Sequence, residues 1–276
     1  MSSRVRDALM RELDSLRHEP TEKRVRALVG DHVAIESTRA MLVWEPRRIV
    51  PSYAVPVEDV RGELLPVPEA TTRPEDHQGQ RLGDLSILDP RVPFAVHTAD
   101  GEPVSVRVHG EVREAVGFRV ADPDLAGHVV LDFGGFDAWY DEDERIVSHP
   151  RDPFHRIDIL HSSREVRIEV DGELVAETRR PMLLFETGLP MRSYLPREDV
   201  RVPLVPSPRR TRCAYKGEAS YWSPQVGGRT HDSLAWSYES PLRDAAEVEG
   251  LIAFFDERVD VEVDGERRPR PVTPWS

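Results

Sequence analysis

Apolar and polar residues alternate along much of the chain, which is the pattern of β-strands with one buried face. The run VRIEVDG places Val166, Ile168 and Val170 on one face, and the Asp-Gly that ends it is a strong hairpin signal. The runs VSVRV at residues 104–108 and VEVDG at residues 261–265 repeat the theme. The pattern therefore predicts short antiparallel strands joined by tight turns.

Helical periodicity is confined to two places. From Ser3 to Arg17 the residues Leu9, Leu13 and Leu16 recur on one helical face. We expect a helix there, packed on the body of the protein in preference to one that binds a partner. A short helix is expected from Leu242 to Gly250. The 24 prolines and 17 glycines suit short strands and many turns, so the predicted fold class is mainly β.

Two segments of the chain read alike. The sequence from Val25 to Pro68 and that from Val166 to Pro208 share one register with a single one-residue gap. The landmarks are Met41 with Met182, Glu45 with Glu186, Ser52-Tyr53 with Ser193-Tyr194, Glu58-Asp59-Val60 with Glu198-Asp199-Val200, and Pro66 and Pro68 with Pro206 and Pro208. Chance does not reproduce such landmarks in order. We therefore predict two diverged copies of one small antiparallel β domain, residues 1–150 and 151–276.

Composition and charge narrow the class of protein. A chain of 276 residues with 39% apolar and 32% charged residues fits a globular protein, and no apolar run is long enough to cross a bilayer. The net charge of −13 argues against a general nucleic-acid or anionic membrane surface, although a local basic pocket remains possible. With one cysteine and a charged N-terminal stretch, we expect a cytoplasmic protein that binds neither nucleic acid nor membrane.

The second copy holds most of the aromatic side chains that could line a binding site. Tyrosine and tryptophan offer an apolar ring with one polar group, which suits the orientation of a small planar ligand. The candidate ligand-binding residues are Tyr194, Tyr215, Tyr221, Trp222, Asp232, Trp236 and Tyr238. The matching region of the first copy has Phe94 as its only aromatic residue, so we interpret that copy as a structural or lid-forming half. Alternatively, the rings are the core of a small β domain.

Three residues near these rings are candidates for catalysis: Glu186, Lys216 and Cys213. Glu186 follows the apolar run PMLLF, so we expect it where a buried strand ends, either paired or functional. Its match Glu45 leaves open a structural pairing common to both copies. Lys216 either binds an anionic group, pairs with Glu186 or lies in solvent. Cys213 alternates with Tyr215, and the alternative to a reactive thiol is a small buried apolar side chain.

Motifs for several other chemistries are absent. The sequence has no Gly-x-Gly-x-x-Gly, no Walker-type loop, no His-Glu-x-x-His and no Gly-x-Ser-x-Gly. Gly227-Gly228 reads as a hairpin turn, and His231-Asp232 as a polar turn, because neighbours on a strand face opposite sides. The sequence leaves the cofactor unknown. A single cysteine excludes a four-thiolate zinc site and the histidines show no recognised metal-ligand spacing, so we predict no metal site, with a site of His, Asp and Glu as the alternative.

Four runs of the second copy carry a resemblance: FETGLPMRSYLPREDV, TRCAYKGEASYW, DSLAWSYESP and GLIAFFDERVD. They resemble the family known as domain of unknown function 427, strongly over residues 152–265 and moderately over residues 25–68. This chain has Ser193-Tyr194 where the family often has two tyrosines, and Cys213-Ala214-Tyr215 where it has Cys-Pro-Tyr. The resemblance implies a mostly antiparallel fold related to the β-tent architecture, some of whose members hold a small ligand in an aromatic cage.

Together these features predict a small-molecule-binding protein or enzyme, with an aromatic-lined polar pocket in the second copy. In an enzyme, Glu186 would be the acid or base and Lys216 would stabilise an anion. The alternative is a non-catalytic protein-interaction or scaffold module whose acidic surface binds a basic partner. Solvent exposure separates them, because a pocket exposes rings beside Glu186 whereas a scaffold buries the rings and pairs Glu186.

Overall fold

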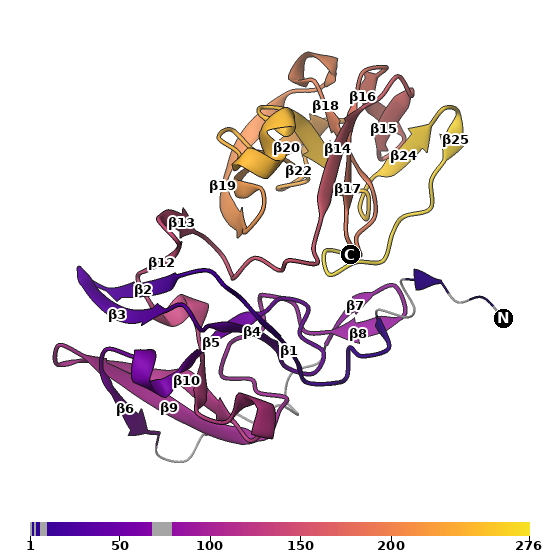
Figure 1. The fold of residues 1–276 in the computed structure, drawn as a ribbon. Helices are drawn as coiled ribbons and strands as arrows, with labels where there is room; N and C mark the ends of the chain where they lie inside the picture. The colour runs from indigo at the N-terminus through magenta and orange to yellow at the C-terminus, as the bar shows by residue number, and fades with distance from the viewer. Residues whose placement is uncertain (1, 3, 6–9, 68–78) are drawn as a thin grey trace. The chain divides into compact units, whose positions relative to one another are not determined.

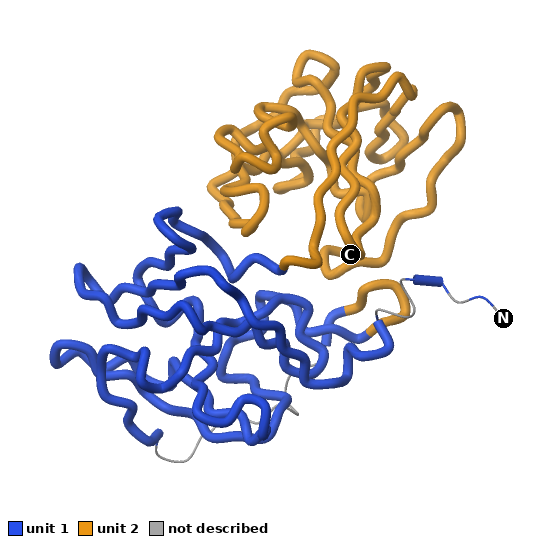
Figure 2. Tube along the Cα trace, viewed as in Figure 1, with its two compact units in different colours: residues 1–80, 86–152 blue, residues 81–85, 153–276 orange. Residues whose placement is uncertain are grey.

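The computed structural model describes residues 2, 4–5, 10–67 and 79–276, and its regular structure is mainly strand (Figure 1). Every ladder between its strands is antiparallel where the register is given. The predicted mainly β fold class is confirmed. The chain divides into two compact units: unit 1 is Met1–Gln80 and Ser86–Asp152, and unit 2 is Arg81–Leu85 and Pro153–Ser276 (Figure 2).

Unit 1 contains two sheets, and residues of both form its largest apolar cluster. Its strands are β1 (Arg17–Pro20), β2 (Val25–Val29), β3 (His32–Ser37), β4 (Met41–Trp44), β5 (Ser52–Pro56), β6 (Glu63–Pro66), β9 (Gly101–Val108), β10 (Glu111–Val120), β11 (His128–Leu131), β12 (Ala138–Asp141) and β13 (Glu144–Ile146). The larger sheet has the order β1-β4-β5-β11-β10-β9-β6, and the smaller has the order β13-β12-β2-β3. Residues Tyr53, Leu131 and Trp139 are almost wholly buried between them. A separate hairpin pairs β7 (Gln80–Leu82) with β8 (Leu85–Ile87).

Unit 2 has the same two-sheet plan. Its strands are β14 (Ile157–His161), β15 (Val166–Val170), β16 (Glu173–Thr178), β17 (Met182–Glu186), β18 (Arg192–Leu195), β19 (Leu204–Cys213), β20 (Gly217–Val226), β21 (Arg229–Thr230), β22 (Ala235–Ser237), β23 (Ile252–Phe254), β24 (Asp260–Val263) and β25 (Glu266–Arg267). The larger sheet runs β14-β17-β18-β23-β22-β20-β19, with β21 paired to β20, and the smaller runs β16-β15-β24-β25. Ile168, Leu195 and Phe254 lie in its core. β19 forms one edge of the larger sheet.

Both units order their strands in the same way. Counting along the chain, and leaving out β7, β8 and β21, the strands of unit 1 occupy the same sheet positions as those of unit 2. A short 3₁₀ helix follows the third strand of each larger sheet, at Val57–Asp59 (η1) and Arg197–Asp199 (η5). These equivalences support the two-copy interpretation, which stays a prediction. The landmark Pro68 lies outside the described residues.

A polar contact holds this helix in place in both units. The Ser37 hydroxyl donates to the Asp59 carboxylate at 2.7 Å, and the Thr178 hydroxyl donates to the Asp199 carboxylate at 2.6 Å. These hydroxyls also accept a backbone N–H two residues further on, at 3.0 Å and 3.1 Å. The same pair of hydrogen bonds therefore recurs in both units, from a serine in unit 1 and from a threonine in unit 2.

The turns follow the predicted pattern. Asp171 and Gly172 have φ angles of 51° and 80°, and they connect β15 to β16. Positive φ at both positions is what a two-residue hairpin of this kind requires. Gly227 and Gly228, with φ angles of 56° and 75°, likewise connect β20 to β21. The Gly-Gly pair is therefore a hairpin turn, as predicted.

The helix expected from Ser3 to Arg17 is wrong in its second half. Residues 11–15 form turns, and Arg17 begins β1, paired with Trp44 of β4. Leu13 is buried all the same, so the apolar stripe reflected packing without a helix. Residues 3 and 6–9 lie outside the described residues. The helix expected at residues 242–250 is confirmed as the 3₁₀ helix η6 (Arg243–Val248).

In the part of the chain that the structure describes, the other 3₁₀ helices are η3 (Pro123–Leu125) and η4 (Phe133–Gly135), and Val5 and Met10 are also helical. Among the described residues, no helix is both long and apolar enough to cross a membrane.

Candidate functional site

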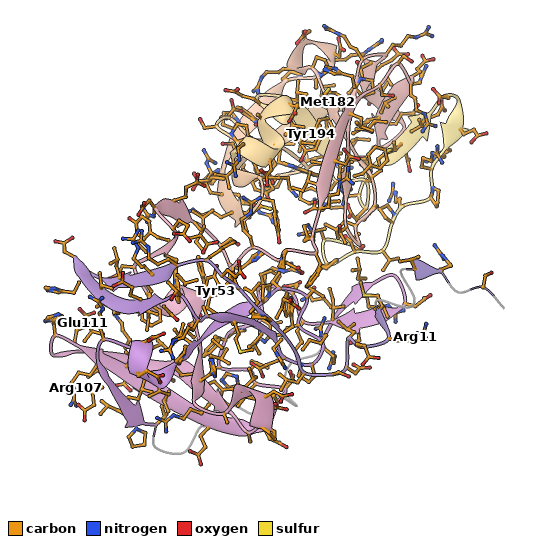
Figure 3. The ribbon with its side chains drawn as sticks, viewed as in Figure 1. Arg11, Tyr53, Arg107, Glu111, Met182 and Tyr194 are labelled. Atoms are coloured by element: carbon orange, nitrogen blue, oxygen red, sulfur yellow. The ribbon has the colours of Figure 1, made fainter. Side chains whose placement is uncertain are left out.

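Strand register aligns three aromatic residues across the larger sheet of unit 2. Tyr194 and Trp236 both pair with Ala253, and Tyr221 pairs with Trp236. Direct partners share a sheet face, so these three rings project to the same side. Tyr194 also pairs with Met182 across β17 and β18, and both lie within the larger sheet (Figure 3). The sequence thus folds residues from five separate strands into one row.

The rings contact one another closely. The Trp236 indole N–H donates to the Tyr194 hydroxyl at 3.2 Å, with the rings perpendicular. Phe255, just after β23, lies 4.7 Å from the Trp236 ring and 6.3 Å from the Tyr221 ring, centre to centre. Tyr238 belongs to the same apolar cluster. We call Tyr194, Tyr221, Trp236, Tyr238 and Phe255 the ring cluster, and all five side chains are buried.

An ion-paired group lies beside the ring cluster. The Lys216 ammonium donates to Glu186 Oε2 at 2.6 Å, and His155 Nε2 lies 3.0 Å from Glu186 Oε1. The Glu186, Lys216 and His155 side chains keep 9%, 10% and 21% exposure. The His155 ring stacks on Tyr215 at 4.5 Å. We call Glu186, Lys216 and His155 the ion-paired group.

Burial and charge act in opposite directions on this group. Burial alone would raise the pKa of Glu186, but the Lys216 charge and hydrogen bonds from His155 and Lys216 lower that pKa to about 2. Burial would lower the pKa of Lys216, yet attraction by Glu186 raises it above its ordinary value. Glu186 is therefore a carboxylate and Lys216 an ammonium at neutral pH. At that pH Glu186 is poorly suited to donate a proton.

The tyrosines nearby stay neutral. Burial raises the pKa of Tyr194 to about 12, partly offset by the Lys216 charge. Burial also raises the pKa of Tyr238 well above its ordinary value. Cys213 is half-buried, interacts electrostatically with Lys216 and Tyr238, and its sulfur accepts the Tyr215 backbone N–H at 3.5 Å. The two hydroxyls are thus neutral at physiological pH.

The lowered pKa of Glu186 gives the unfolding free energy a defined pH dependence. A carboxyl group with a lower pKa in the folded state stabilises the fold above its unfolded pKa of about 4.5. This contribution, on the order of 3 kcal/mol at 1.36 kcal/mol per pKa unit, is lost as the pH falls towards 2. We expect urea unfolding between pH 5 and pH 2 to show a steep loss of stability. Glu186→Gln should make that loss shallower, and an identical acid profile in this variant would contradict the assignment.

The structure does not bring Trp222 and Asp232 into the ring cluster. Trp222 follows Tyr221 directly on β20, so it faces the other side of the sheet, where its indole N–H donates to Ser237 at 2.8 Å. The Arg197 guanidinium covers the Trp222 ring at 3.9 Å. Asp232 lies exposed between β21 and β22 and accepts the Ser233 hydroxyl at 3.2 Å. Both were candidates because they are close in sequence, which does not fix the side of a sheet.

Sequence reasoning missed a second buried polar group next to Trp236. The Arg192 guanidinium pairs with Glu257, contacts Asp256 at 3.5 Å and lies 5.8 Å from the Trp236 ring. Thr273 donates to Glu257 at 2.5 Å. Burial raises the pKa of Asp256 to about 6, although Arg192 opposes the change. The available signal was alternation, because Arg192 precedes Tyr194 by two residues on one strand.

His155 was also missed as a partner of Glu186. Ile157, two residues after His155, pairs directly with Glu186, and residues two apart in an extended chain point to the same side. That pairing becomes visible only once β14 is known to lie beside β17.

The corresponding glutamate of unit 1 is paired by different groups. Glu45 is buried, lies 3.0 Å from His97 Nδ1 and accepts the backbone N–H groups of Thr98 and Ala99 at 2.7 Å and 3.2 Å. Arg48 lies at 4.0 Å. Both glutamates are therefore ion-paired, but the histidine comes from before the strand in unit 2 and from far beyond it in unit 1.

The fold and these contacts define unit 2 as an antiparallel β domain with a buried, ionisable cluster. Residues 158–265 match the profile of the family described as domain of unknown function (DUF427), so this segment is a domain of that family, as the resemblance predicted. The match includes Glu186, Cys213 and Lys216, whereas His155 precedes it. No curated protein matches the chain. Among the described residues, no group of three or more metal-ligating side chains is present.

Proposed function

We propose that unit 2 binds a small molecule where the ion-paired group meets the ring cluster. The observation that carries this proposal is the Glu186–Lys216 pair, 2.6 Å apart and about nine-tenths buried among aromatic side chains. Charges removed from water cost free energy, and their concentration at one place is typical of functional sites. The Glu186 and Lys216 side chains keep 9% and 10% exposure, and a ligand would reach the pair through this exposed part.

The site offers complementary groups to one polar ligand. Lys216 can hold an anionic or carbonyl oxygen, and Glu186 can accept N–H or O–H groups, while the tyrosines contribute neutral hydroxyls. His155 is the most exposed member of the ion-paired group, so it is the member best placed at the entrance. These groups would bind and orient such a ligand.

We further propose that unit 1 is a diverged copy with a structural role. Its larger and smaller sheets have the strand order of unit 2, and its Glu45 is only 3% exposed, closed in by backbone N–H groups. The β-tent relationship implied by the family resemblance also remains part of this proposal.

One observation favours the alternative of a protein-interaction or scaffold module. Tyr194, Tyr221, Trp236 and Tyr238 are between 1% and 8% exposed, as expected for rings that fill a core. In that case the ion-paired group holds the sheet together, and no small molecule enters.

A ligand screen separates these two functions. Full-length protein is screened by thermal shift against small polar metabolites, where a ligand at about 100 times its dissociation constant stabilises by about 2.7 kcal/mol. Hits are repeated on Glu186→Gln, Lys216→Ala and the milder His155→Gln, each checked for folding by circular dichroism. We expect binding to weaken at least about 10-fold in Glu186→Gln, which corresponds to 1.4 kcal/mol. Unchanged binding in folded Glu186→Gln and Lys216→Ala would reject the site.

A further inference from the structure

Two exposed arginines lie on the rings of the ring cluster. The Arg209 guanidinium carbon is 4.3 Å from the centre of the Tyr221 ring and 6.0 Å from that of Phe255. The Arg258 guanidinium carbon is 5.8 Å from the Phe255 ring. Two cations from different elements therefore share one aromatic ring.

Local backbone structure puts both arginines in position. The register of β19 against β20 is irregular between Ser207 and Arg210, so Arg209 departs from the regular strand alternation. Arg258 lies in the turn after β23, where its backbone N–H donates to the Phe255 carbonyl at 2.7 Å. The irregular register at Arg209 and the turn at Arg258 thus place each side chain next to an aromatic ring.

Neither guanidinium forms an ion pair with any residue that the structure describes. The Arg258 side chain has one weak contact, a 3.5 Å hydrogen bond to the Asp232 carbonyl, and Arg209 contacts rings. Several exposed arginines elsewhere in unit 2 pair with carboxylates, as in Arg164 with Asp264 and Arg180 with Glu198, whereas the exposed Arg197 lies over the Trp222 ring. In a chain of net charge −13, two adjacent arginines without carboxylate partners make a local anion-attracting site.

The two arginines also cover the route to the rings. The Tyr221 ring lies directly under Arg209, and Trp236 lies behind Phe255 at 4.7 Å. Exposed arginine side chains change rotamer freely, whereas the rings are fixed by packing. Part of the burial of Tyr221 and Phe255 therefore comes from side chains that a ligand can displace.

We propose that Arg209 and Arg258 bind the anionic group of the unit 2 ligand, and that a planar part of the same ligand takes their place on Tyr221 and Phe255. This inference rests on the proposed function and specifies its ligand class. Two guanidinium groups match the charge and the hydrogen-bonding fork of a phosphate monoester. The ligand class is a small aromatic phosphate monoester.

Phenyl phosphate is the probe for this class. Isothermal titration of the full chain should show binding of phenyl phosphate, and at least about 5-fold weaker binding of inorganic phosphate, because inorganic phosphate has no planar group to stack on a ring. Arg209→Ala and Arg258→Ala should each weaken phenyl phosphate binding about 10-fold or more, as expected for a lost charge-assisted hydrogen bond. Arg179→Ala is the matched control, because Arg179 is exposed and pairs with Glu165 at 3.0 Å.

The outcomes separate this inference from the proposed function. Absence of phenyl phosphate binding, or equal binding by wild type and both arginine variants, overturns the inference. If the binding of a screened ligand requires Glu186 and Lys216 but not Arg209 or Arg258, the proposed function stands and the inference fails. A third outcome is that phenyl phosphate binding requires the two arginines while no ligand requires Glu186 or Lys216 for binding. The arginines then form an anion site, but the proposed function fails. The inference is overturned with it, because it assigns the class of the unit 2 ligand.

Discussion

Lys216→Met is expected to destabilise the protein by about 3 to 5 kcal/mol, the usual cost of removing one partner of a buried ion pair. The substitution keeps an apolar side chain of similar length but leaves the Glu186 carboxylate nine-tenths buried without its cation. His155 remains at 3.0 Å and compensates only in part. Urea unfolding at pH 7 measures the effect, read from a circular dichroism signal.

Two controls isolate the ion pair from simple loss of packing. The double variant Glu186→Gln/Lys216→Met should be more stable than Lys216→Met alone, because no buried charge is then left without a partner. Arg164→Met breaks the pair of Arg164 with Asp264, in which the two side chains are 39% and 48% exposed, so its effect should stay near 1 kcal/mol or below. Equal losses in Lys216→Met and Arg164→Met would show that burial of the Glu186 charge is not the cause.

Arg192→Met is expected to have an effect of similar size, about 3 to 5 kcal/mol. Arg192 is the cation that faces the fully buried Glu257 carboxylate, and it also lies 3.5 Å from Asp256. Because Arg192 lowers the pKa of Asp256, its removal should raise that pKa further above about 6. Urea unfolding measures the stability change, and the pH dependence of stability between pH 5 and 8 should shift in the same variant.

Arg180→Met supplies the comparison for this second experiment. Arg180 pairs with Glu198 at 2.8 Å, but both side chains are more than 60% exposed, so the loss should be below about 1 kcal/mol. Arg192→Met/Glu257→Gln should recover part of the stability lost in Arg192→Met. A loss in Arg192→Met no larger than that in Arg180→Met would mean that Glu257 does not depend on this partner.

The alternation of apolar residues was sufficient to predict the fold class and several turns. Asp171-Gly172 and Gly227-Gly228 are hairpin turns because both positions need positive φ, a requirement that local sequence expresses directly. The same reasoning failed for the N-terminal helix, whose second half was wrongly predicted. Arg17 pairs with Trp44 of β4, and a distant strand partner outweighed the local helical spacing of Leu13 and Leu16.

For the candidate site, the residue types were easier to predict than their grouping. The contact of Glu186 with Lys216 was among the stated alternatives, and the structure shows it at 2.6 Å. His155 and Arg192 were missed because their roles depend on which strands lie side by side. Trp222 was grouped with Tyr221 because they are neighbours in sequence, but one residue along a strand reverses the face. The sequence shows which residue types lie close together along the chain. To know which side chains share one face of the sheet, the order of the strands is also needed.

The edge strand β19 has features that disfavour strand pairing with another molecule. A ten-residue strand at the border of a sheet exposes unpaired backbone groups, and these can recruit a strand from another molecule. Here the border carries Arg209, Arg210 and Arg212 together with an irregular register. Like charges on two such borders repel, and the kink prevents a straight match. Arg209, which is proposed to bind an anion, therefore also belongs to a charged edge of the kind that disfavours strand pairing between molecules.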